Sequence, residues 1–358
     1  MAMLRSIRFW VGGCLSLVCL WLAVRNVPFV DFAHYLTGAN YIWLLPAVVL
    51  QLLAVVVRAW RWVVLLREKR DRLADSFWAQ GIGYLFTNVL PLRMGEPARV
   101  IVMSERCGLA VMQVAASAFV ERLLDVATIV FVLILILPWM QVPDLVIRAG
   151  TSFGALVLLV IVIMLFVVRF RDRSERLLKA LCKRIPILPA EWIVVRWKEL
   201  MQGLVPLTKW SVAMQAISWS MVAWAFSIGT FWCVLYSFDS SATAVEAAFM
   251  IVALSLALTV PSSPGFIGVF QLVGQQALVL PFGTKYDAGS ALAITLTAHL
   301  AYYLITSALG VIGLWRFGES FANLGRIITK GRSAPKTNSG PSPSETVSQR
   351  GKQGKKSC

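Results

Sequence analysis

Charged side chains gather in one otherwise apolar part of this chain, between residues 93 and 125. They stand in two short motifs, R-M-G-E-P-A-R and E-R-L-L-D, with apolar runs around them: Arg93, Glu96, Arg99, Glu121, Arg122 and Asp125. A charge at the centre of a membrane helix costs roughly 2.5–3.5 kcal/mol on insertion scales. Charges kept there despite that cost mark a functional site and are expected to pair with one another.

Helical spacing predicts which of these charges meet. Three pairs lie three or four residues apart and can share a helix face: Glu121 with Asp125, Arg122 with Asp125, and Glu96 with Arg99. We expect Arg122 to neutralise one acid on its own helix, which leaves the other for Arg93 or Arg99. At an effective dielectric of about 20, an ion pair at about 4 Å gains roughly 4 kcal/mol, which offsets most of the insertion cost.

Two interpretations of this network remain open from the residues alone. In the first, the ion pairs only hold neighbouring segments together. In the second, they bind lipid phosphate, because arginine presents a planar fork that suits phosphate. Further candidates for binding an anion are Asn88 and Gly95. Pro91 is expected to break a helix, and the backbone groups that this break leaves free could also bind an anion.

A second unusual stretch is P-S-S-P-G-F-I-G at residues 261–268, within an apolar run. Ser262 is a candidate to line a polar path, although the motif is also typical of a kinked turn. His299 lies near the middle of the last apolar run and is either functional or a packing residue with one hydrogen bond. Catalysis by Ser262 with His299 would need an orienting acid that the sequence does not show.

Composition defines the class of protein. Of the 358 residues, 58% are hydrophobic and 15% are charged, whereas soluble domains are about 45–50% apolar and 25% charged. Several apolar runs reach about 20 residues, the length that spans a bilayer. The net charge of +16 comes from basic residues at segment ends and in the tail, which favours topology signals and anionic lipid over nucleic acid. We therefore predict an all-α, polytopic membrane protein that needs no metal or other cofactor.

The apolar runs predict six spanning helices, with a loop at residues 25–40 and an amphipathic cytoplasmic linker at 170–209. The expected spans are 9–24, 41–66, 111–140, 151–168, 211–236 and 290–314. The second span ends in a basic cluster that places that end, and both termini, in the cytoplasm. The cluster consists of Arg58, Arg61, Arg67, Lys69, Arg70 and Arg72. Residues 1–316 form the transmembrane domain, and the polar, basic residues 317–358 are expected to be a largely disordered tail.

The number of membrane crossings between segment ends assigned to the same side must be even, and this predicts two broken hairpins. Residues 76–106 must enter from the cytoplasmic side and return. Residues 247–280 form either a hairpin entered from the outer side or two tightly bent spans. Non-helical backbone survives at membrane depth only where protein or water shields it. Two such hairpins from opposite faces resemble the inverted repeats of transporters, whose sites lie near the midplane.

These motifs resemble, in order and spacing, the flippase-like transmembrane region of bacterial lysylphosphatidylglycerol synthases and its stand-alone relatives. The similarity covers about residues 5–316, through R-M-G-E-x-x-R, V-E-R-L-L-D, P-x-x-P-G-x-x-G and His299. Gln271 stands where the family usually carries an acid. The sequence shows no soluble aminoacyl-transfer domain, so the resemblance implies movement of a lipid between leaflets and not synthase activity.

The resulting hypothesis is a lipid flippase or lipid-transport factor of the cytoplasmic (inner) membrane, with a phospholipid, glycolipid or isoprenoid-type lipid as cargo. The alternative is a non-catalytic scaffold or partner of a lipid- or envelope-modifying enzyme. The expected partners are membrane lipids that are anionic or carry phosphate, and the oligomeric state stays open. The residues expected along the path are Asn88, Arg93, Gly95, Glu96, Arg99, Glu121, Arg122, Asp125, Ser262, Pro264, Gly265, Gln271 and His299.

Overall fold

Helices make up the regular structure of the described part of the chain. The computed structural model describes residues 7–25, 27–67, 72–90, 93–140, 144–184, 189–259 and 263–321, and no strand occurs within these ranges. The α-helices are α1 (Ile7–Val24), α2 (Phe29–Gly38), α3 (Leu44–Leu66), α4 (Leu73–Val89), α5 (Gly95–Cys107), α6 (Val111–Ile136), α7 (Asp144–Arg169), α8 (Arg171–Arg184), α9 (Ala190–Leu204), α10 (Trp210–Phe238), α11 (Ala244–Ala257), α12 (Val269–Phe282) and α13 (Ala288–Phe317). The predicted all-α class is confirmed.

Five helical segments of the described chain are long and apolar enough to cross a membrane: Tyr41–Leu66, Gly150–Arg169, Trp210–Phe238, Pro264–Phe282 and Ala288–Phe317. A sixth span results if α1 and α2, which meet at 85°, are counted together. The protein is therefore a multi-pass membrane protein. Helix α6 is 26 residues long but carries the E-R-L-L-D charges in its middle.

The predicted loop at residues 25–40 is wrong, because α2 occupies most of it. Pro28 stands immediately before the first helical residue and Gly38 ends the helix. Proline is well suited to a helix start because its φ is already near the helical value.

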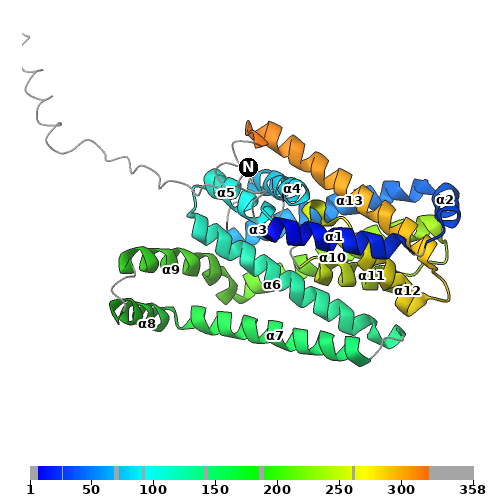
Figure 1. Ribbon diagram of the computed structural model, residues 1–358. Helices are drawn as coiled ribbons and strands as arrows, with labels where there is room; N and C mark the ends of the chain where they lie inside the picture. Colours follow the sequence, from blue (N-terminus) through cyan, green and yellow to red (C-terminus); the bar gives the residue numbers. More distant parts are fainter. Residues whose placement is uncertain are drawn as a thin grey trace, which may run out of the picture. The chain divides into compact units, whose positions relative to one another are not determined.

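The long helices pack side by side, with α3 along α10 and α4 along α13. In Figure 1, α8 and α9 lie at one end of the view, whereas α2 and α12 lie toward the other. Glycine allows the close approach of α4 and α13, since a Cβ on Gly310 would lie 2.6 Å from the Gly81 carbonyl oxygen. Small residues serve this purpose in membrane helix packing, where backbones must come close to gain dispersion contacts.

The two segments predicted to be broken hairpins are indeed broken, and their tips meet. Helices α4 and α5 pack against each other, and so do α11 and α12. The second break carries Gly265 and Gly268 at positive φ, +66° and +89°, a region that glycine enters without strain. A Cβ on Gly265 would lie 3.2 Å from the backbone oxygen of Asn88 in the first hairpin. Entry of the hairpins from opposite membrane faces stays a prediction.

Two further predictions concern the cytoplasmic linker at residues 170–209 and the tail at 317–358. Helices α8 and α9 occupy the predicted cytoplasmic linker, and their placement at a membrane surface stays a prediction. Residues 322–358, which contain most of the predicted tail, lie outside the described residues, as do Pro91 and Ser262.

Candidate functional site: a ring of six charges beside a pocket

Three arginines and three carboxylates form a closed, alternating ring at the junction of α3, α5 and α6. We call it the charge ring. Its consecutive pairs are Arg122–Glu96 (3.4 Å), Glu96–Arg99 (2.7 Å), Arg99–Glu121 (2.6 Å), Glu121–Arg61 (3.1 Å), Arg61–Asp125 (2.7 Å) and Asp125–Arg122 (3.3 Å). Each carboxylate touches two arginines and each arginine two carboxylates, so the ring as a whole is electrically neutral.

Burial differs sharply around the charge ring. The side chains of Arg61 and Glu121 are fully buried, whereas those of Glu96 and Arg122 are 42% and 46% exposed. The two longest pairs of the ring, at 3.3 and 3.4 Å, both involve Arg122. The ring therefore has a closed, tightly bonded side and an open, looser side.

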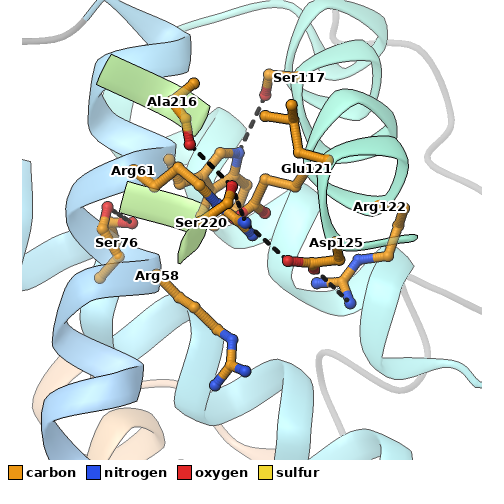
Figure 2. Close-up of polar contacts among 12 residues, drawn as sticks. Arg58, Arg61, Ser76, Ser117, Glu121, Arg122, Asp125, Ala216 and Ser220 are labelled. Carbon is orange, nitrogen blue, oxygen red and sulfur yellow. Dashed lines mark hydrogen bonds and ion pairs between the residues drawn. The ribbon is translucent and has the colours of Figure 1, made fainter. Parts of the chain in front are cut away.

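Neutral groups on α10 complete the buried side of the ring. Arg61 donates to the Ser220 hydroxyl at 2.8 Å, and the Trp224 indole donates to Asp125 at 3.2 Å. Figure 2 shows Arg61 reaching from α3 toward Ser220 and Asp125. On the neighbouring side, the Arg99 guanidinium lies 4.8 Å from the centre of the Trp62 ring. Buried charges are tolerated when paired and hydrogen-bonded. The ion pairs give every charge of the ring a partner, while Arg61 Nε has no hydrogen-bond partner among the described residues.

Two of the three pairs predicted from helical spacing are present, because Glu96 meets Arg99 and Arg122 meets Asp125. The third pair, Glu121 with Asp125, is bridged by Arg61, which binds both carboxylates. Of the two arginines proposed for the remaining acid, Arg99 binds Glu121. Sequence reasoning missed Arg61, which it treated as part of the basic cytoplasmic end of a helix. The available signal was its position more than one turn before the helix ends at Leu66, among apolar residues.

A pocket of about 270 Å³ opens beside the charge ring. Its lining combines charged side chains, neutral polar side chains and apolar side chains. Charged lining residues are Arg58, Arg93, Glu96, Arg99, Arg122 and Asp125, while apolar ones include Ile129, Phe231, Ile251, Leu254, Leu258, Phe266 and Phe270. The tips of both broken hairpins reach the pocket, so the fold brings together motifs that are far apart in the sequence.

His299 lines this pocket and is bonded at both ring nitrogens. Its Nε2 lies 2.9 Å from the carbonyl oxygen of Gly265, which can only accept, so Nε2 carries the proton. Its Nδ1 then accepts from the Gln271 amide at 2.8 Å, and the Gln271 Oε1 accepts from the Gly268 N–H at 2.7 Å. The His299 ring also stacks on Phe270 at 4.3 Å. A neutral His299 therefore ties α13 to the second helix break.

The other predicted site residues divide into two groups. Asn88 lines the pocket, but its amide nitrogen already donates to Thr306 and Ser307. Gly95 also lines the pocket, and it allows α4 and α5 to cross, because a Cβ there would lie 1.9 Å from the Gly83 oxygen. Pro264 starts the short 3-10 turn that contains Gly265. These residues shape the pocket, whereas Gln271 acts behind it through His299.

The fold and this site define a class: a helical, multi-pass membrane protein with a charge-lined pocket enclosed among its helices. The chain belongs to the family described as lysylphosphatidylglycerol synthase TM region, whose model matches residues 9–310. The predicted resemblance is confirmed. The family describes the membrane part of those synthases and not their catalytic part, and it relates the chain to lipid processes. No curated protein and no solved structure matches the chain.

Proposed function

We propose that the protein moves a lipid between the leaflets of the inner membrane, as a flippase or lipid-transport factor. The observation that supports this is a pocket within the helical bundle whose lining combines charged and apolar side chains. A lipid has the same division between a polar headgroup and apolar tails. Membership of a lipid-related membrane family agrees with this proposal.

The mechanism follows from the charged and apolar side chains that line the pocket. The headgroup enters the charged side of the pocket, where guanidinium groups replace its water, while the acyl tails follow the apolar side. The charge ring keeps several buried charges stable without presenting net charge to the lipid. Glu96 and Arg122, the exposed members of the ring, are the pair that a passing headgroup can displace at the lowest cost.

Lipid movement in proteoliposomes that hold only the purified chain tests this function. A headgroup-labelled phosphatidylglycerol and a labelled glycolipid are followed side by side. Glu96→Gln removes a negative charge from the open side of the ring and should reduce movement, as should Arg93→Ala. The matched control is Glu191→Gln, since Glu191 is exposed on α9 and away from the pocket.

Unimpaired movement in both pocket variants would remove these residues from the mechanism. If the folded wild-type chain moves neither lipid, the flippase proposal fails. A scaffold role would then be tested by asking which lipid-modifying enzyme co-purifies with the chain.

A further inference from the structure

The arginines around the pocket outnumber the carboxylates by two. The charge ring is neutral, and the excess comes from Arg58 and Arg93, which line the pocket outside the ring. Among the described residues, neither has a carboxylate within 4 Å. In Figure 2, Arg58 lies below the ion pairs of Arg61 and Arg122, and no dashed line joins it to a carboxylate.

Among the residues that the structure describes, the partners of Arg58 are neutral groups. Its Nη2 donates to the Ser227 hydroxyl at 2.8 Å, and its guanidinium carbon lies 5.9 Å from the centre of the Trp224 ring. A guanidinium has five N–H groups, so most of its donors remain available on the pocket side. These neutral contacts hold the side chain of Arg58 in place without cancelling its charge.

Arg93 is held at the tip of the first hairpin, against the second. Its guanidinium carbon lies 5.7 Å from the centre of the Phe266 ring, and its buried Nε has no hydrogen-bond partner among the described residues. Its φ is +54°, in the left-handed region that non-glycine residues rarely occupy and that is found where surrounding structure holds a functional residue in place. The backbone thus holds this arginine at the pocket.

Unpaired cations inside a membrane bundle are costly, and those retained usually mark a ligand. Two guanidinium groups provide planar forks for phosphate oxygens and an excess of two positive charges. A phosphomonoester carries about 1.5 to 2 negative charges at pH 7, whereas a phosphodiester carries one. The apolar side chains that line the same pocket add a place for a hydrocarbon chain.

We propose that this pocket selects a phosphate group with two negative charges on an apolar chain, such as a lipid phosphomonoester or diphosphate, and that Arg58 and Arg93 bind it. The inference rests on the proposed function in taking the same pocket as the headgroup site. It differs from that proposal in assigning recognition to the two arginines outside the charge ring. The Glu96 carboxylate repels such an anion little, because Arg99 and Arg122 both bind it.

Calorimetric titration of the full chain in a neutral detergent tests the inference without measuring transport. The ligands are dioctanoyl phosphatidic acid, dioctanoyl phosphatidylglycerol and inorganic phosphate, so that the two lipids share their chains and differ in headgroup. We expect phosphatidic acid to bind at least about tenfold more tightly than phosphatidylglycerol. Arg58→Gln and Arg93→Gln should each weaken its binding by about tenfold or more, since each removes a charged hydrogen-bonding partner.

Two other arginines serve as matched controls. Arg106 and Arg316 also lie over aromatic rings, at 3.9 and 5.6 Å from the ring centres, but outside the pocket. Their changes to Gln should leave the preference for phosphatidic acid intact. If Arg93→Gln fails to fold, Arg93→Lys, which keeps the charge but loses the fork, should fold and weaken binding less.

Equal affinity of the wild type for the two lipids would overturn the inference, as would a preference that survives in the double Gln variant. Inorganic phosphate binding as tightly as phosphatidic acid would overturn it too, because the ligand would then be a soluble anion. A selective chain that moves no lipid would retain this inference and refute the flippase proposal. A wild-type chain that moves lipid but binds phosphatidic acid and phosphatidylglycerol equally would do the reverse.

Discussion

The charge ring makes a direct prediction for Arg61, which is fully buried between two carboxylates. Arg61→Met removes the positive charge that binds Glu121 at 3.1 Å and Asp125 at 2.7 Å. Glu121 then keeps Arg99 as its arginine partner and Asp125 keeps Arg122, and the ring carries one net negative charge. Methionine is of similar length and apolar, so the loss of charge pairing should dominate over any cavity.

The expected magnitude follows from burial. Removing one partner of a buried ion pair costs about 3–5 kcal/mol, because the remaining charge stays buried and uncompensated. Arg122→Met is the matched control, since it also loses two ion pairs of the same ring, but its side chain is 46% exposed and its pairs are longer. Exposed pairs contribute about 0–1 kcal/mol, so Arg122→Met should be much less destabilising.

Thermal unfolding in detergent, followed by the fraction that remains monodisperse, measures the difference. At about 2 °C per kcal/mol, Arg61→Met should lower the apparent Tm by roughly 6–10 °C and Arg122→Met by about 2 °C or less. The double variant Arg61→Met with Asp125→Asn restores neutrality, because two arginines and two carboxylates then remain. It should therefore be more stable than Arg61→Met alone, with a coupling energy of about 1–3 kcal/mol.

Equal stability of Arg61→Met and Arg122→Met would refute the argument from burial. Destabilisations that simply add in the double variant would show that charge balance around the ring has no energetic weight.

Three further predictions concern other parts of the structure. Gly95→Ala should destabilise the protein by about 3 kcal/mol or more, because the new Cβ would lie 1.9 Å from the Gly83 oxygen. The control Gly13→Ala should be tolerated, because a Cβ there would have no atom within 4 Å. Equal thermal stability of the two variants would contradict this prediction. Gln271→Glu should make stability fall as pH rises from about 6 to 9. A carboxylate cannot donate to His299 Nδ1, so the bonds of His299 to residue 271 and to the Gly265 carbonyl oxygen then both need an N–H on the imidazole, which requires a doubly protonated ring. A flat profile like that expected for the wild type would argue against the assigned hydrogen-bond directions. At Asp287, burial raises the pKa of the carboxyl group, but hydrogen bonds from Ser290 and Tyr35 outweigh it and hold the pKa below the usual range; the wild type should therefore lose stability below about pH 4 that Asp287→Asn does not lose, and melting curves from pH 3 to 7 that run parallel would refute this.

The sequence by itself determined the class of protein and the local pairs of charges. Long apolar runs can bury their backbone polar groups in lipid only as helices, so the all-α class follows from composition. Glu96 with Arg99 and Arg122 with Asp125 could be predicted because the helical repeat alone brings residues three apart together. The two helix breaks were visible in the same way, from proline and glycine within apolar runs.

Only the tertiary structure decided which charges balance one another. Arg61 joins the ring because α3 packs beside α6, and Arg99 reaches Glu121 because Gly95 lets α5 cross α4 closely. Arg58, three residues before Arg61 on the same helix, has no carboxylate within 4 Å among the described residues. His299 and Gln271 are 28 residues apart in the sequence and meet because α12 packs against α13. Helix crossings are set by the shapes of facing side chains, and a one-dimensional pattern of charge and hydropathy does not contain those shapes.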